Sequence, residues 1–208
     1  MVRVAQCWDD GVINDLRYIG ILRKYHVPAT FNLNPGLCSL SGRLSLKDLP
    51  EVYAGFKVAS HCMHHEHPEK VTPEAFLRSA LDARHALEDM FQRECPGFAW
   101  PYGAYTSELC DAMLDAGFRY GRTTGNTASV GEFDHPMRLH SSCHFLDAGF
   151  DRIFDAAKAA GGIFYFWGHT YEMKDDPELW RSIEDRIRRF CEDPEVRWCD
   201  VIDIVTPA

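Results

Sequence analysis

The stretch that decides the fold is VRVAQCWDDG, residues 2–11, where a β-prone run ends at a pair of aspartates. Further apolar runs along the chain also end in polar or turn residues, and segments with a helical spacing of apolar residues lie between them. Strands that alternate with helices indicate parallel β-α units, in which the carboxyl ends of the strands meet at one edge. The sequence therefore predicts an α/β fold with its polar clusters on one face.

The periodicity of apolar residues assigns most of the chain. It predicts strands at residues 2–8, 29–33, 56–60, 97–100, 120–124, 137–141, 163–167 and 196–205. It predicts helices at residues 14–25, 46–53, 72–94, 107–116, 150–160 and 178–191. The third helix has the clearest start, because Thr72 offers a capping hydroxyl, Pro73 suits the first helical position and Glu74 places an acid in the first turn.

Two architectures fit this order of elements, a barrel and a doubly wound sheet. Polar residues follow the predicted strands at Asp9-Asp10, His61 with His65, Pro101-Tyr102-Gly103, Arg122 and His169. The top face of a barrel brings such residues together. A nucleotide-binding sheet would need a glycine-rich first turn, and neither GxGxxG nor a Walker sequence occurs. We therefore expect a (β/α) barrel.

The composition is that of one globular domain covering residues 1–208, with 46% hydrophobic and 25% charged residues. The formal net charge of −9 argues against nucleic acid as a partner, because phosphate binding relies on an excess of lysine and arginine. We find neither a signal peptide nor an apolar run long enough to span a membrane. The eight cysteines form no C-x-x-C pair, so we expect reduced thiols and a cytoplasmic protein.

A cluster of histidines indicates a metal site. Four of them fall within seven residues, namely His61, His64, His65 and His67. His61 and His65 are four residues apart and would point to one side of a helical turn. With a carboxylate from Asp9-Asp10 they would hold a divalent ion and leave positions open, which is the pattern of a catalytic metal site. A surface stretch without metal is the alternative, and the fold decides between the two.

Several motifs resemble, in order, those of the polysaccharide deacetylases, the NodB-homology domains of family 4 carbohydrate esterases. The family's Thr-Phe-Asp-Asp-Gly appears as Cys7-Trp8-Asp9-Asp10-Gly11, and its His-Ser/Thr-x-x-His as His61-Cys62-Met63-His64-His65. Its Arg-x-Pro-Tyr-Gly appears as Ala99-Trp100-Pro101-Tyr102-Gly103, and its last strand with a catalytic histidine resembles Phe166-Trp167-Gly168-His169. Val27-Pro28-Ala29-Thr30-Phe31 resembles the second strand of the family. The resemblance implies a distorted (β/α) barrel with about seven strands.

The resemblance also implies a ligand set for a divalent metal ion, made of Asp10, His61 and His65. The ion is most simply Zn²⁺, with Co²⁺, Ni²⁺, Mn²⁺ or Fe²⁺ as alternatives. His64 and His67 are not expected to bind it, and no role is predicted for His144.

The remaining site residues follow from the same resemblance. Asp9 would be the general base and His169 the general acid, while the backbone N–H of Tyr102 would stabilise the oxyanion. Three further residues are candidates for contact with substrate, namely Trp100, Pro101 and Glu172. Glu172 is also a candidate for orienting His169.

The chain departs from the family pattern at three positions. Cys62 replaces a serine or threonine, the proline expected after the second histidine is displaced to Pro68, and Ala99 replaces an arginine that orients the base. Arg122, at the end of the next predicted strand, would supply the missing guanidinium by pairing with Asp9. Such a pair would hold the carboxyl ionised at neutral pH.

We expect metal-dependent hydrolysis of an amide bond, namely removal of the acetyl group of an N-acetylated amino sugar or related small saccharide or oligosaccharide. Hydrolysis of another non-peptide C–N bond, in an N-formyl group, a ureide or a cyclic imide, is an alternative, because a cytoplasmic enzyme would not meet extracellular chitin or peptidoglycan. A ligand-binding relative without activity is a third reading, motivated by Ala99. The sequence leaves the oligomeric state open.

Overall fold

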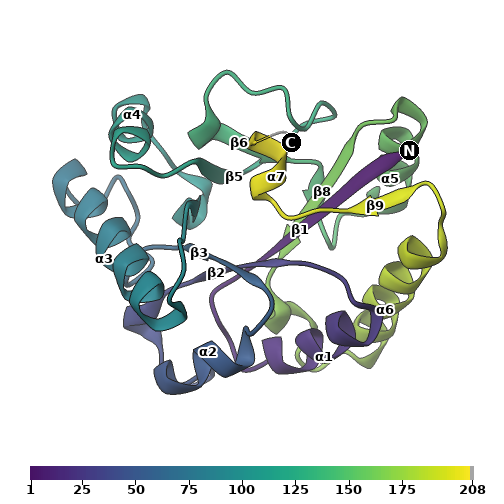
Figure 1. The fold of residues 1–208 in the computed structure, drawn as a ribbon, viewed down its shortest axis with the longest axis horizontal. Coiled ribbons are helices and arrows are strands. Elements are labelled where there is room, and N and C mark those ends of the chain that lie inside the picture. The colour runs from purple at the N-terminus through teal and green to yellow at the C-terminus, as the bar shows by residue number, and fades with distance from the viewer. Residues whose placement is uncertain (207–208) are drawn as a thin grey trace.

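Residues 1–206 are described by a computed structural model in which one parallel sheet curls into a nearly closed barrel (Figure 1). Its strands are β1 (Val2–Asp9), β2 (Thr30–Leu33), β3 (Lys57–Ser60), β4 (Gly97–Ala99), β5 (Tyr120–Asn126), β6 (Leu139–Ser141), β7 (Cys143–His144), β8 (Ile163–Gly168) and β9 (Val196–Trp198). The order around the barrel is β6-β5-β4-β3-β2-β1-β8-β7, and β9 pairs with the first residues of β1. Ser142 alone joins β6 to β7, the two ends of this order.

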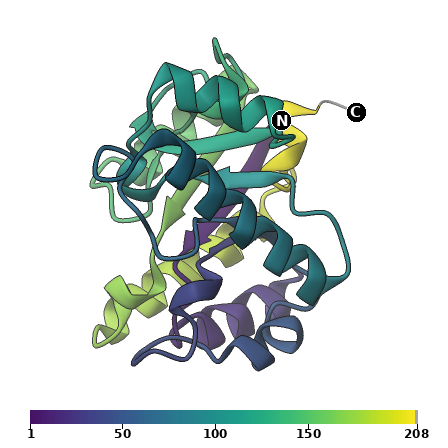
Figure 2. The same cartoon turned by 90° about the vertical axis from the view of Figure 1, so that its left-hand side faces the viewer.

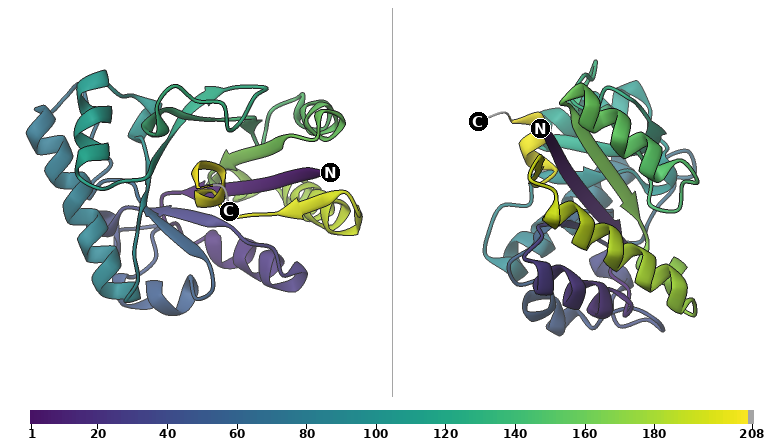
Figure 3. Two further views of the ribbon diagram at one scale, coloured as in Figure 1. Left: turned by 45° about the horizontal axis from the view of Figure 1, so that its top comes forward. Right: turned by 90° about the vertical axis from the view of Figure 1, so that its right-hand side faces the viewer.

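Helices lie around the outside of the strands, except the short last helix, which packs against the interior cluster of the barrel. They are α1 (Asp15–Tyr25), α2 (Leu49–Val52), α3 (Pro73–Phe91), α4 (Ser107–Asp115), α5 (Phe150–Ala160), α6 (Pro177–Glu192) and α7 (Ile202–Val205). α3 and α4 cover the side that faces the viewer in Figure 2, and α5 and α6 cover the opposite side, seen on the right of Figure 3. Within residues 1–206, no helix combines the length and apolar character needed to cross a membrane.

Strand alternation separates the two faces of the sheet and places the site. In β1, Val4 and Trp8 pack outward against the helices, whereas Ala5 and Cys7 belong to a cluster inside the barrel. Because side chains alternate along a strand, the next inward position is Asp9 at the carboxyl end. The expected (β/α) barrel is confirmed, and its top face is the face toward which β1 carries the aspartates.

The end of the chain differs from the prediction of one strand at residues 196–205. β9 stops at Trp198, and α7 follows, stabilised by a hydrogen bond from the Asp200 N–H to the Asp203 side chain at 2.9 Å. Val201 and Ile204, three residues apart, are buried in the interior cluster, and a strand could not present both to it. Burial at helical spacing therefore outweighs the β-prone composition of this segment.

Two smaller differences concern the strands between α4 and α5. The predicted strand at residues 137–141 is a 3₁₀ turn (Pro136–Arg138) followed by the three-residue strand β6. The two-residue strand β7 was not predicted, because a segment this short carries no periodicity. It pairs with Phe166 and Trp167 of β8, so its position is set by tertiary contacts.

Asp15, the first residue of α1, ties this helix to the loop that follows β8. Its carboxyl group is fully buried and accepts hydrogen bonds from the hydroxyl groups of Thr170 and Tyr53. Burial raises the pKa of Asp15 to about 7 even though both hydrogen bonds act in the opposite direction. Thr170 directly follows His169, so this buried contact helps to fix one wall of the site.

Asp15→Asn is expected to gain stability relative to the unmodified protein as pH rises. The Asp15 pKa is about 7 in the folded chain against an ordinary value of 3.8, so between these values the folded protein keeps a proton that the unfolded chain has lost. The stability that this proton provides is complete below the ordinary pKa and is lost through pH 7, at roughly 1 kcal/mol per pH unit. Asparagine cannot ionise and escapes this loss. Urea unfolding at pH 5, 6, 7 and 8 measures the difference, and a difference independent of pH would show that the buried carboxyl is already ionised.

Candidate active site

Loops at the carboxyl ends of five strands enclose a pocket of about 230 Å³. The residues that line it are Asp9, Asp10, His61, His65, Trp100, Tyr102, Arg122, Thr124, Trp167, His169 and Tyr171. Most of the residues singled out in the sequence therefore meet in one place. Pro101 and Glu172 are not among the lining residues, although both neighbour residues that are.

Asp10, His61 and His65 form a group that can hold a metal ion, with one potential ligand atom from each lying within 4.8 Å of the others. His61 Nδ1 lies 2.7 Å from the Ala99 carbonyl oxygen and donates its proton to it, which leaves the Nε2 lone pair free. Burial lowers the pKa of His61 to about 4, so the ring is neutral at pH 7. Asp10 Oδ1 and His61 Nε2 are both buried, have no hydrogen-bond partner within residues 1–206 and lie 4.0 Å apart. A divalent ion fits this arrangement, because neutral imidazole and carboxylate are its usual ligands.

The segment that carries the two histidines is a loop, so the expectation of a helical turn is wrong. Cys62 and His65 both have positive φ values, 62° and 58°, and the rings of His61 and His65 meet edge to face with centroids 4.6 Å apart. The Asn34 side chain donates hydrogen bonds to the carbonyl oxygens of His61 and Cys62 and holds the loop in this course. The two histidines converge through a backbone bend that their spacing alone does not reveal.

Asp9 is a buried carboxylate with a partner on each oxygen. Asn32 donates to its Oδ1 at 2.6 Å, and the Arg122 guanidinium donates to its Oδ2. Burial raises the pKa of Asp9, but Arg122, His61 and His169 outweigh this and hold the pKa well below its usual range. The expected contact between Arg122 and Asp9 is thus present, and Asp9 is ionised at neutral pH.

Strand register explains how Arg122 reaches Asp9. Ala99 of β4 and Arg122 of β5 are register partners, so the two side chains extend side by side from neighbouring parallel strands. The guanidinium also lies over the Trp167 ring, 4.5 Å from its centroid, and is fully buried. Arg122 therefore occupies the interior beside the position from which an arginine at residue 99 would project.

His169 faces Asp9 from the other side of the pocket, with Nε2 at 3.8 Å from Asp9 Oδ2. Its Nδ1 lies 3.2 Å from Glu172 Oε2, and its backbone N–H donates to the same oxygen at 2.9 Å. Burial lowers the pKa of His169, but Glu172 and Asp9 outweigh it, so the pKa is raised overall. Glu172 therefore contacts His169, whereas a direct contact with substrate stays a prediction.

The two aromatic residues of the Ala99-Trp100-Pro101-Tyr102-Gly103 motif differ in exposure. Trp100 is fully buried, stacks on Phe76 with centroids 5.6 Å apart, and donates its indole N–H to the Met137 carbonyl at 2.7 Å. Its ring therefore packs between barrel and helices and offers no free face to a sugar. Tyr102, with φ of 60°, is 62% exposed at the mouth of the pocket and packs against the His65 ring.

His64 and His67 lie outside the pocket. The His64 ring packs against Gly36, where a Cβ would come within 2.3 Å of it, and His67 Nδ1 accepts a hydrogen bond from the Glu69 N–H at 3.2 Å. Within residues 1–206 neither histidine belongs to a group of side chains that could hold a metal.

Two residues that contact the aspartates were not predicted. Asn32 occupies an inward position of β2, and its place among polar residues at alternating positions, Thr30, Asn32 and Asn34, was an available signal. Arg43 donates to the Asp10 carbonyl oxygen and lies 3.5 Å from Asp10 Oδ1. It comes from an irregular loop, so no sequence pattern places it there.

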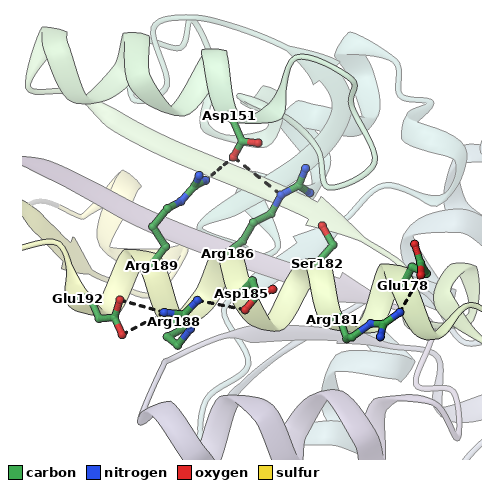
Figure 4. Close-up of a pocket in the computed structure, with 9 residues that line it drawn as sticks. All are labelled: Asp151, Glu178, Arg181, Ser182, Asp185, Arg186, Arg188, Arg189 and Glu192. Atoms are coloured by element: carbon green, nitrogen blue, oxygen red, sulfur yellow. Dashed lines mark hydrogen bonds and ion pairs between the residues drawn. The ribbon is translucent and has the colours of Figure 1, made fainter.

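A larger hollow of about 820 Å³ lies beside α6 and α5 (Figure 4). Its arginines pair with acids around them: Arg189 and Arg186 with Asp151, Arg188 with Asp185 and Glu192, and Arg181 with Glu178. Exposed ion pairs of this kind are ordinary surface features. The candidate site is therefore the smaller pocket at the top of the barrel.

Residues 2–121 match the model of the polysaccharide deacetylase family, and the chain belongs to that family. The curated protein YxkH of Bacillus subtilis (strain 168) is 24% identical over 119 residues, which are 56% of this chain and 43% of YxkH. The match thus spans less than half the length of that relative.

Solved structures share the fold. A crystal structure from Mycobacterium smegmatis matches with a TM-score of 0.73 and 16% identity, over 99% of this chain and 90% of that one. A family 4 acetyl xylan esterase from Clostridium thermocellum in complex with a cobalt ion matches with a TM-score of 0.63 and 15% identity, over 98% and 90% of the two chains. At these identities the likeness establishes the fold alone.

Proposed function

We propose that the chain is a metal-dependent deacetylase that hydrolyses the N-acetyl group of an amino sugar or small saccharide. The observation that carries the proposal is the pair of buried atoms that have no hydrogen-bond partner among residues 1–206, Asp10 Oδ1 and His61 Nε2, which face the same pocket as Asp9 and His169. Leaving buried polar atoms unsatisfied is costly, and a divalent ion would satisfy both. The cobalt ion bound by the Clostridium thermocellum esterase supports the same reading.

The position of each residue supports a role in this reaction. A divalent ion held by Asp10, His61 and His65 would make a water molecule more acidic and polarise the acyl carbonyl. Asp9 would take the proton of the water, and His169 would give a proton to the leaving nitrogen from the opposite side. The 3.8 Å between Asp9 Oδ2 and His169 Nε2 lets both side chains reach one reacting group. The backbone N–H of Tyr102 would stabilise the oxyanion.

The directions of the two pKa shifts support the protonation states that these roles need. The lowered pKa of Asp9 keeps it ionised at neutral pH, but it also makes Asp9 a weak base, so this role requires a water that is already acidified. The raised pKa of His169 favours the protonated ring that a general acid needs. Arg122 contributes by holding Asp9 ionised and in place.

The pocket supports a small substrate. Its volume of about 230 Å³ lies below the roughly 300–1,000 Å³ of pockets for drug-sized ligands. The net charge of −9 favours a neutral or cationic group over an anionic one. We propose a small saccharide in the cytoplasm, where the eight free cysteines would remain reduced. Another non-peptide C–N bond remains the alternative substrate, and the acetyl ester named for the Clostridium thermocellum relative is a second candidate.

The test combines metal content with product release. Purified protein should contain one divalent ion per chain and release acetate from diacetylchitobiose. Chelation should abolish this release, and reloading with Zn²⁺ or Co²⁺ should restore it. Acetate release from acetylated xylan but not from diacetylchitobiose would assign the ester. Bound metal with hydrolysis only of N-formyl, ureide or cyclic-imide compounds would assign another C–N bond. A chain with neither metal nor hydrolysis would be a ligand-binding relative.

A further inference from the structure

Glu172 lies at the centre of a hydrogen-bond chain behind His169. Its Oε2 lies 3.2 Å from His169 Nδ1 and, on the other side, 3.1 Å from His144 Nε2. The backbone N–H of His169 donates to the same oxygen. These contacts outweigh the effect of burial and lower the pKa of Glu172 to about 2, so the carboxyl is ionised and can only accept.

The hydrogen bond that His144 Nδ1 accepts determines which ring nitrogen carries the proton. The backbone N–H of Leu146 points at His144 Nδ1 at 3.3 Å, so Nδ1 must carry the lone pair. In the neutral ring the proton then sits on Nε2 and is donated to Glu172. The His144 ring packs edge to face against Trp167, with centroids 4.6 Å apart. The Arg122 guanidinium also lies over the Trp167 ring.

We propose that His144 is a positioning residue for His169. By donating its Nε2–H to Glu172, it holds the carboxylate against Nδ1–H of His169. The proton on Nδ1 and the orientation of that ring keep His169 Nε2 directed into the pocket beside Asp9, from where it would give its proton to the leaving nitrogen. The inference rests on the proposed function in taking His169 as the general acid.

A second metal ion is the competing explanation, because His144, His169 and Glu172 also offer three ligand atoms within 4.8 Å of one another. Binding through His144 Nε2 would require a lone pair on that atom and would move its proton to Nδ1. There the proton would face the Leu146 N–H, and two donors would oppose each other. The hydrogen-bond chain satisfies every one of these atoms, whereas the metal site does not.

Nitrogen NMR of the zinc-loaded protein, labelled with ¹⁵N-histidine, tests the proton positions without any substrate. We expect His144 to be protonated on Nε2 with a free Nδ1, and His169 to carry a proton on Nδ1. A proton on Nδ1 of His144 in the unmodified protein would overturn the proposal, and this arm does not depend on a variant that folds.

Variants of His144 then distinguish a role in positioning His169 from a purely structural role. His144→Leu should lower kcat about tenfold, the smaller end of effects seen when an outer hydrogen-bond partner is lost, with KM unchanged. It should also broaden or shift the Nδ1 signal of His169. His144→Gln, whose amide nitrogen can replace Nε2–H, should restore both. His85→Leu, on the exposed face of α3, is the matched control and should change neither.

Three results would contradict the idea. The first is a His169 signal that is identical in His144→Leu and the unmodified protein. The second is a kcat that His144→Gln does not restore. The third is a zinc content of two ions per chain that falls to one in His144→Leu, which would assign the second metal site. If the unmodified protein shows no hydrolysis at all, the proposed function fails, while the NMR comparison still decides the positioning role.

Discussion

Replacing His61 by alanine is expected to reduce bound metal from one ion per chain to almost none. His61 is buried, its Nδ1 donates to the Ala99 carbonyl oxygen, and its Nε2 has no hydrogen-bond partner in the described part of the chain. Loss of this ring leaves only Asp10 and His65, too few ligands for a stable site. Elemental analysis after dialysis against buffer without chelator measures the effect, and turnover should fall with the metal content.

His64→Ala is the matched control, since His64 belongs to the same loop but packs against Gly36 and not toward the pocket. It should keep its full metal content and most of its turnover. If instead His64→Ala lost the metal and His61→Ala kept it, the ligand assignment would be wrong, although the fold would be unaffected.

Asp9→Asn is expected to retain the metal and to lose turnover by about 10²–10⁴-fold, the usual contribution of a general base. The structure adds a second consequence. Arg122 is buried and would lose the negative charge that compensates it, and such a loss costs about 3–5 kcal/mol of stability. The melting temperature should therefore fall as well, and turnover has to be measured well below it.

A double variant separates the two effects. Asp9→Asn combined with Arg122→Met removes the uncompensated charge, so it should recover part of the melting temperature while turnover stays low. Turnover that returns together with stability would mean that Asp9 acts only as a structural partner of Arg122. Near-normal turnover in Asp9→Asn alone would end the general-base assignment.

The fold could be predicted because its main signal is local. Each parallel strand ends where apolar residues give way to polar ones, and the convergence of these ends follows from β-α geometry alone. Segments such as β7 and α7 were missed because their structure depends on contacts rather than on periodicity. A two-residue strand has no periodicity to detect. The composition of residues 196–205 favours a strand, but burial of Val201 and Ile204 in the barrel interior requires helical spacing.

Contacts within the site could be predicted from the sequence only where they depend on which strands are neighbours. That Arg122 lies beside Ala99 could be anticipated because successive strands of a barrel lie next to each other, whereas its contact with Asp9 of β1 crosses the barrel interior. Contacts made by loops could not be anticipated in this way. Arg43 reaches Asp10, and His144 reaches Glu172, through backbone bends that no spacing rule describes.

Because Ala99 and Arg122 lie side by side, the effect of a substitution at one of these positions depends on the residue at the other. An arginine introduced at residue 99 while Arg122 is present would put two guanidinium groups beside one buried carboxylate, leaving a positive charge without compensation. The same change would be favourable only after Arg122 had gone. The interaction between the two sites therefore changes sign with genetic background, and the route between the two arrangements passes through an intermediate with either two guanidinium groups or none.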